Sequence, residues 1–268
     1  MIKIKKKALF DPSSNKMKTV SNVNFARDEF MKNNNKNLNF LLNNRFKWMK
    51  NFFNENDQGL EVGAGAGFSK YFIKNKKFKI SDLAEYDHLD LVNIDAQNTK
   101  LETNTYDFVI ASNMIHHVPY PIKFLDEMHR ILKPGGKLII QDANCSILFQ
   151  IITIIMKHEG FDFTKNVWNE NEAMSNENDV WSGNIAVTNL IFDDLNNFKK
   201  RFSDKFTIQH HKNYECFIFL NSGGVTSKTI YLPLNNFLLT GLNFIDNILT
   251  KFFPNIFALG KQIVLKKI

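Results

Sequence analysis

Apolar and polar residues follow one another along this chain in short blocks that predict helices and strands in turn. Between residues 22 and 53, apolar side chains recur at steps of three and four, which is the spacing of an amphipathic helix. Later blocks are expected to form five strands (59–62, 78–82, 91–95, 106–112 and 137–141) and two helices (68–73 and 121–132). Because strands that alternate with helices indicate βαβ units, we expect a mainly parallel sheet.

After about residue 145 the alternation loosens and longer segments replace it. We expect helices at 147–158, 188–202 and 234–253, a polar loop at 164–184, a long strand or hairpin arm at 206–220, and a final strand at 261–267. Residues 1–20 are expected to form an irregular lead-in. The 268 residues allow one large domain or one domain with an appended subdomain, and length alone does not choose between them.

The chain is basic, with a formal net charge of +7, and part of this excess lies in lysines near its two ends. They are Lys3, Lys5, Lys6 and Lys7 at one end and Lys261, Lys266 and Lys267 at the other. No basic stripe interleaved with aromatic residues follows, so we expect no nucleic-acid partner. A basic surface suits an anionic small substrate or contact with an anionic membrane surface, although an ordinary solvated surface explains it as well.

Cysteine usage and hydropathy indicate a cytoplasmic protein without a transmembrane segment. Cys145 and Cys216 form no Cys-x-x-Cys pair, so they predict neither a zinc site nor a disulfide framework. The longest apolar run, 147–156, is interrupted by Gln150 and Thr153 and is shorter than the roughly 20 residues that span a bilayer. The charged N-terminus lacks the apolar segment of a secretory signal.

A glycine-rich loop, Glu61-Val-Gly-Ala-Gly-Ala-Gly67, joins the first expected strand to a helix. Glycines let the backbone turn sharply and approach a ligand closely, and the start of a helix presents free N–H groups. The dinucleotide fingerprint is Gly-x-Gly-x-x-Gly, but the third glycine of that pattern is replaced here by Phe68. A nicotinamide-dependent oxidoreductase is therefore the less favoured of the enzyme classes that use such a loop.

Three acidic residues end successive expected strands on the side of this loop: Glu61, Asp82 and Asp95. Asp82 lies 21 residues after Glu61, where a carboxylate can accept hydrogen bonds from both ribose hydroxyls. Asp95 could meet the exocyclic amine of an adenine. The alternative is that the acids merely end strands in solvent, which explains one such residue better than three.

Four segments in order resemble the successive motifs of class I S-adenosylmethionine-dependent methyltransferases. They are Leu60–Gly67, Ile94–Ala96, Tyr106–His117 and His129–Gly136, and the resemblance covers roughly residues 58–144. It implies S-adenosylmethionine as cofactor and S-adenosylhomocysteine as product. By this resemblance, the methionine part of the cofactor lies near Glu61 and the loop residues Gly63, Ala64, Gly65 and Gly67, and the ribose lies at Asp82. The adenine lies at Asp95 and Ala96, and Leu83 is a candidate for packing on it. Ser112 and Asn113 lie beside the cofactor.

The resemblance also implies an α/β fold, with a Rossmann-like, mostly parallel, seven-stranded sheet and helices on both faces. Residues 262–267 could supply its antiparallel strand, and additional helices are expected at the N-terminus and after the fifth strand. We expect an N-terminal helical extension (1–55) and a methyltransferase domain (56–268), with a cofactor-binding core (58–144), an acceptor-side insertion (about 145–205) and C-terminal strands and helix (206–268). One departure is that the usual helix between the second and third strands has shrunk to a loop.

Two histidines follow the fourth expected strand, at the mouth of the predicted cofactor site. A hydroxyl acceptor gains from a general base that titrates near neutral pH, and we propose His116 for this role with His117 beside it. Alternatively, one packs against the cofactor and the other caps the backbone. His210 and His211 are adjacent on an expected strand and point to opposite faces, so we assign no metal site.

The acceptor is the least determined part of the prediction. Trp181-Ser-Gly-Asn-Ile-Ala186 and Ser222-Gly-Gly224 resemble uncharacterised methyltransferases encoded with surface-polysaccharide genes, which suggests O-methylation of a small or glycan-linked acceptor. A non-catalytic cofactor-binding scaffold, or a subunit of an active partner, is the main alternative. A membrane-surface role for residues 234–253 is another, although core packing or partner contact suits that segment better. Oligomeric state is not indicated.

Overall fold

The computed structural model describes residues 7–8, 23–157, 159–226 and 228–268. Its strands are β1 (Lys7–Ala8), β2 (Gly59–Val62), β3 (Phe78–Ile80), β4 (Tyr106–Ser112), β5 (Leu132–Ala143), β6 (Phe161–Asp162), β7 (Phe206–Tyr214) and β8 (Gly260–Lys267). Its α-helices are α1 (Val23–Lys32), α2 (Lys36–Lys47), α3 (Ser69–Phe72), α4 (Pro121–Ile131), α5 (Ile147–Met156), α6 (Val187–Phe192), α7 (Leu195–Phe202), α8 (Phe217–Leu220), α9 (Asn236–Phe252) and α10 (Pro254–Phe257). Two 3-10 helices, η2 (Trp48–Phe52) and η3 (Ile115–His117), complete the described elements.

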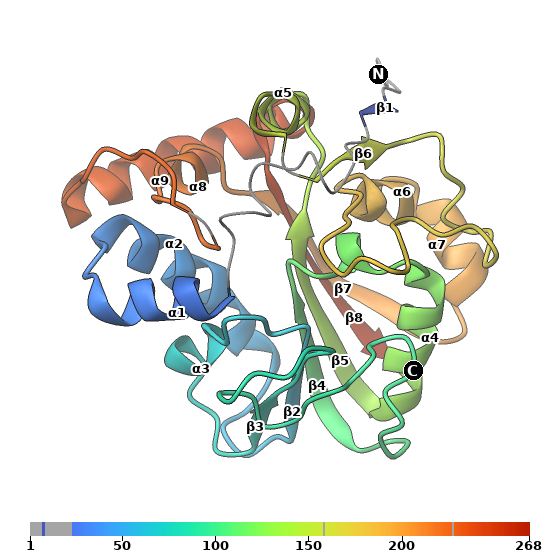
Figure 1. Cartoon of the computed structure of the whole chain (residues 1–268). Coiled ribbons are helices and arrows are strands. Elements are labelled where there is room, and N and C mark those ends of the chain that lie inside the picture. Colours follow the sequence, from blue (N-terminus) through green and yellow to red (C-terminus); the bar gives the residue numbers. More distant parts are fainter. Residues whose placement is uncertain (1–6, 9–22, 158, 227) are drawn as a thin grey trace.

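The main sheet has the strand order β3-β2-β4-β5-β8-β7. The first four strands are parallel, and β8 lies antiparallel between β5 and β7. Helices α4, α6 and α7 lie on one side of the sheet and α1, α2 and α3 on the other (Figure 1). The predicted Rossmann-like α/β fold and the antiparallel strand near the C-terminus are therefore confirmed.

Alternate residues of the central strands feed two separate hydrophobic cores. On β4, Val109 and Ala111 pack with α4, α6 and α7, whereas Phe108 and Ile110 pack with α1 and α2. All four side chains are fully buried. This alternation follows from the pleat of a strand, and burial on both faces explains why the sequence of β4 is almost continuously apolar.

The sheet contains six strands in the described part of the chain, not the seven expected. The strand predicted at 91–95 is reduced to a single parallel bridge between Leu91 and Ser81. Asn93 has a left-handed φ of 57°, which interrupts the extended backbone that a strand needs. The carbonyl of Asp82 still accepts the N–H of Ile94 at 3.0 Å, so the segment runs beside β3 without forming a ladder.

Several expected elements are divided by local capping. The amphipathic segment between residues 22 and 53 becomes α1, α2 and η2, because the side chain of Asn35 caps α2 by accepting the N–H of Leu38 at 3.1 Å. Asp194 likewise caps α7 and separates it from α6. The predicted long strand ends at Tyr214, and α8 follows it. The polar loop after β6 and the helix after Ser146 form as predicted.

Helix α9 turns an unexpected face to solvent. Phe237, Phe244 and Phe252 are more than 60% exposed, whereas Asp246 is buried. The Asp246 carboxylate accepts the N–H groups at the start of α8, from residues 216–218, at 2.9 to 3.0 Å. Core packing of this segment is thus contradicted for its exposed phenylalanines, and partner or membrane contact stays a prediction.

The N-terminal helices join the same core as the sheet. Leu41, Leu42 and Phe46 of α2 are buried against it. The Nζ of Lys7 lies 3.4 Å from Oδ2 of Asp162, and β1 pairs with β6. Most of the expected lead-in, including Lys3, Lys5 and Lys6, lies outside the described residues. The boundaries predicted at residues 55, 145 and 205 stay predictions. None of the described helices is long and apolar enough to cross a membrane.

Candidate active site

The glycine loop after β2 adopts a conformation that favours glycine at three positions. Gly63, Gly65 and Gly67 have φ values of 66°, 50° and 67°. A Cβ on Gly63 would lie 2.9 Å from Met114, and one on Gly67 would lie 2.8 Å from Ile80. A Cβ on Gly65 would meet nothing within 4 Å, so the space beside this glycine is open to a ligand.

Two side chains from the segment after β3 hold this loop in place. The Asp82 carboxylate accepts the Gly65 N–H at 2.8 Å and the Ala84 N–H at 3.0 Å. His88 Nε2 lies 2.7 Å from the Gly65 carbonyl oxygen. Asp82 thus lies beside the glycine loop, and its contact with the ribose stays a prediction. His88 is a contact that the sequence analysis missed, because no motif connects it to the loop.

Glu61 is the most strongly perturbed acid of the cofactor side. Its side chain is buried at the end of β2 and accepts a hydrogen bond from the Ser69 hydroxyl. Burial raises the pKa of Glu61 to about 8, with the nearby Asp82 charge adding to the shift against the lowering effect of Ser69. The carboxyl group is therefore mostly protonated at pH 7, and a bound ammonium group would favour its ionised form.

The remaining predicted cofactor residues also lie near the carboxyl ends of the parallel strands. Asp95 accepts the Gln97 N–H at 2.8 Å, Ala96 is buried, and Leu83 is 49% exposed. Ser112 ends β4 and Asn113 follows it, and both contact Gln141 of the neighbouring strand. The open cradle at Gly65 and the carboxylate of Asp82 beside it fit an adenosyl cofactor. The helix after the loop spans only Ser69–Phe72, so its dipole contributes less to binding of a ligand at the loop than a longer helix would.

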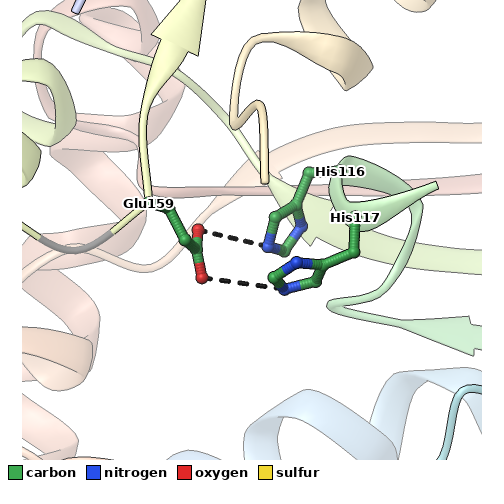
Figure 2. A group of neighbouring side chains, drawn as sticks. All are labelled: His116, His117 and Glu159. Atoms are coloured by element: carbon green, nitrogen blue, oxygen red, sulfur yellow. Dashed lines mark ion pairs between the residues drawn. The ribbon is translucent and has the colours of Figure 1, made fainter. Parts of the chain in front are cut away.

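Beyond β4, three side chains converge from two separate segments (Figure 2). His116 and His117 lie in η3, and Glu159 lies between α5 and β6. Glu159 Oε2 is 3.3 Å from His116 Nε2, and its Oε1 is 3.7 Å from His117 Nε2. The Nδ1 of His116 bonds the buried Asp142 carboxylate, and that of His117 lies 3.1 Å from the Ser182 carbonyl oxygen. Sequence analysis singled out both histidines but missed Glu159.

The pKa values of the two histidines are shifted in opposite directions. Burial opposes a charge on His116, but Asp142 and Glu159 outweigh this effect and hold the pKa of His116 well above its ordinary value. Burial and the neighbouring charge of His116 lower the pKa of His117. In the protein alone, His116 is therefore the protonated member of the pair, and His117 is neutral.

A cavity of about 700 Å³ begins at these histidines and extends beneath α5 and α8. Asn113, Glu159 and Trp181 line it, together with several side chains from α5. Residues 222 and 224 of the predicted Ser-Gly-Gly motif line it as well, so both segments of the second resemblance reach this cavity. Trp168, unlike Trp181, packs against the hydrophobic core that contains residues of α4.

A buried ion pair also lines the cavity. Arg45 of α2 donates to both carboxylate oxygens of Glu215, at 2.9 and 2.6 Å, and both side chains are less than 10% exposed. The guanidinium also lies 5.0 Å from the ring centre of Phe219. No motif in the sequence indicates this pair, because its members lie 170 residues apart.

Comparisons with known proteins match the part of the chain that contains the glycine loop and the strands beside it. Residues 60–140 match the family model described as a methyltransferase domain. The demethylmenaquinone methyltransferase of Oceanobacillus iheyensis is 36% identical over 75 residues, which are 28% of this chain and 31% of that protein. That of Staphylococcus epidermidis is 32% identical over 80 residues, or 30% of this chain and 32% of that protein. The similarity thus spans about a third of the length of these curated relatives.

A solved structure extends the likeness in fold to nearly the whole chain. The S-adenosylmethionine-dependent methyltransferase of Archaeoglobus fulgidus superposes with a TM-score of 0.54 and 14% identity, covering 92% of this chain and all of that one. The domain match confirms the predicted methyltransferase family and its S-adenosylmethionine cofactor for residues 60–140. The solved structure confirms the predicted fold. Residues 60–140 of this chain form a methyltransferase domain of the class I, S-adenosylmethionine-dependent type.

Proposed function

We propose that the protein transfers the methyl group of S-adenosylmethionine to an oxygen atom of a small acceptor bound in the 700 Å³ cavity. One observation carries this proposal. The cavity is lined both by Asn113, which directly follows β4 beside the expected cofactor site, and by His116 and His117. An acceptor in this cavity would therefore lie between the methyl donor and a group of ionisable side chains.

The residues that would bind the cofactor are those at the ends of β2, β3 and β4. The bound cofactor supplies a methyl group already activated by its sulfonium, so the protein's main task is to align the acceptor for in-line displacement. We assign Glu61 to the amino group of the methionine part and Asp82 to the ribose. Asp95 and Leu83 are assigned to the adenine. The assignments of Glu61 and Asp82 rest on their positions at the ends of β2 and β3 and on the open space at Gly65. Those of Asp95 and Leu83 rest on the segment that follows β3.

The proton of an acceptor hydroxyl has to leave toward a nearby group. Arg45 and Glu215 are bonded to each other at the cavity wall, which leaves the His116, His117 and Glu159 cluster for this role. We assign activation of the acceptor to the cluster and not to His116 alone, because the Nε2 atoms of both histidines face Glu159 (Figure 2).

The cavity walls favour an acceptor with an apolar body. Much of the wall comes from apolar side chains of α5, α8 and the segment before α9, including Phe149, Ile152, Ile155, Met156, Phe219 and Ile230. Ile155 and Ile230 are strongly exposed, so the opening is apolar as well. We propose a hydroxyl on an apolar group, or a sugar carried by one, for which Trp181 could provide stacking. The matched domain ends at residue 140, before most wall residues, so it does not identify this acceptor.

Calorimetry with S-adenosylmethionine and S-adenosylhomocysteine is the first test, and binding of neither would contradict the proposal. The second test incubates the protein with methyl-labelled cofactor and paired acceptors that differ only in a free or a blocked hydroxyl. We expect label in the free-hydroxyl member alone. Cofactor binding without transfer to any acceptor would favour the non-catalytic scaffold, and quenching of NADH fluorescence would revive the oxidoreductase.

A further inference from the structure

The cluster of His116, His117 and Glu159 has the composition and spacing of a metal site. Its potential ligand atoms, one from each residue, all lie within 4.8 Å of one another. The three side chains are shielded from solvent, and Glu159 is only 12% exposed. They point toward a common centre at the wall of the cavity (Figure 2).

Contacts on the far side of each imidazole ring fix the atoms that face this centre. The Asp142 carboxylate and the Ser182 carbonyl accept hydrogen bonds from the Nδ1 atoms of His116 and His117, respectively. In the protein alone, the Nε2 of protonated His116 donates toward Glu159. A metal ion at this centre would take the place of that proton, and the Nε2 lone pairs of both neutral rings and a Glu159 oxygen would then face the ion. Orientation of metal-binding histidines by a carboxylate or a carbonyl is the usual arrangement around protein metal sites.

We propose that His116, His117 and Glu159 bind one divalent transition-metal ion. Around an ion with bonds of about 2.0–2.1 Å, neighbouring ligands lie ~3.0–3.4 Å apart, and the two Nε2-to-oxygen distances are 3.3 and 3.7 Å. Two imidazoles and one carboxylate favour Zn²⁺, Fe²⁺ or Mn²⁺ over Mg²⁺ and Ca²⁺, which prefer oxygen ligands. The carboxylates of Glu159 and Asp142 balance the charge of such an ion.

The position of the ion suggests its role. Three protein ligands leave coordination positions open, and those on the cavity side face the space assigned to the acceptor. A hydroxyl oxygen bound there would lose its proton to water more readily, because the cation stabilises the resulting negative charge. This role rests on the proposed function, whereas metal binding itself does not.

Metal binding is measurable without an acceptor. Untagged protein is freed of metal with a chelator, titrated with Zn²⁺ alone by calorimetry, and titrated with Co²⁺ to read the ligand-field absorption. We expect one ion per chain. The Glu159→Gln variant keeps the shape of the side chain, and its affinity for Zn²⁺ should fall at least ~100-fold; Asp142→Asn should cost ~10–100-fold through His116.

His211→Ala provides the matched control, because His211 belongs to the other adjacent pair of histidines and lies exposed on β7. Its affinity for Zn²⁺ should equal that of the unaltered protein. Equal binding by Glu159→Gln, or no stoichiometric binding at all, would overturn the metal site. Calorimetry with S-adenosylhomocysteine on the same samples separates the two proposals. A protein that binds S-adenosylhomocysteine but not Zn²⁺ would overturn the metal site alone. A protein that does not bind S-adenosylhomocysteine would overturn the proposed function.

Discussion

The cofactor side and the acceptor side of this molecule are assembled in different ways. On the cofactor side, contacts join residues close in the sequence: Ser69 bonds Glu61 eight residues away, and Gly65 bonds Asp82 seventeen residues away. On the acceptor side, Arg45 bonds Glu215 across 170 residues. A site made of local contacts leaves a motif in the sequence, whereas a site made of distant contacts depends on the whole fold.

The two sides also differ in what they present to a ligand. The cofactor side offers carboxylates and a bare backbone at the ends of parallel strands, which suits a polar adenosyl group. The acceptor side offers apolar walls from α5 and α8 around one cluster of ionisable groups. Substitutions on each side should therefore have separable effects, and four experiments test this from the largest expected effect to the smallest.

The largest effect is expected on stability, from breaking the buried ion pair of the acceptor side. Arg45→Met leaves Glu215 charged and buried without its partner, so the free energy of unfolding should fall by ~3–5 kcal/mol. Denaturant unfolding followed by circular dichroism measures this change. In the double variant Arg45→Met, Glu215→Leu, most of the loss should be recovered.

The exposed pair of Lys32 and Asp28, at 3.5 Å, is the control, and Lys32→Met should change the free energy of unfolding by less than ~1 kcal/mol. Equal losses for Arg45→Met and Lys32→Met would show that the acceptor side does not depend on its distant ion pair.

The next effect separates turnover from cofactor binding. Glu159→Gln should lower kcat by ~100-fold or more, because the cluster loses the carboxylate that faces both histidines. Affinity for S-adenosylhomocysteine should change less than twofold, since Glu159 lies on the acceptor side. Steady-state assays with an acceptor found by methyl labelling, run beside calorimetry, give both numbers. A parallel loss of cofactor affinity would mean that the two sides are not separable.

The same contrast explains how far the sequence could predict the site. Glu61, Asp82 and the three glycines were identifiable because they lie in one strand–loop–helix unit and just after the strand that follows it, so their spacing already determines their proximity. Glu159 was not, because its approach to His116 depends on where α5 ends and how it crosses the sheet. Neither composition nor periodicity contains that information.

Residues with weak individual signals were also underestimated. Asn37 is one of many asparagines, yet its buried side chain donates to the carbonyls of Asn221 and Leu232 and accepts the N–H of Leu234. It thereby anchors the segment before α9 to α2. The strand predicted at 91–95 failed for a local reason, because Asn93 adopts a left-handed conformation that no apolar pattern reveals.

On the cofactor side, Asp82→Asn should weaken binding of S-adenosylhomocysteine by ~10-fold, because hydrogen bonds to a charged carboxylate contribute roughly 1.5–3 kcal/mol each and the amide keeps part of them. Calorimetry measures the change. Asp87 on the same segment is exposed, and Asp87→Asn should leave the affinity unchanged. If Asp87→Asn weakened binding as much, a general loss of negative charge would explain the effect better than a ribose contact.

The smallest effect concerns Glu61 and pH. Its pKa is about 8 in the free protein, and pairing with the ligand's ammonium group requires the ionised form, so binding releases a proton below pH 8. Affinity for S-adenosylhomocysteine should therefore rise with pH, by ~5-fold between pH 7 and pH 8, since the ionised fraction rises from about a tenth to a half. Glu61→Gln has no such proton to release and should show a flat profile over this interval. A fivefold rise that persists in Glu61→Gln would assign the titration to another group and separate Glu61 from the methionine part of the cofactor.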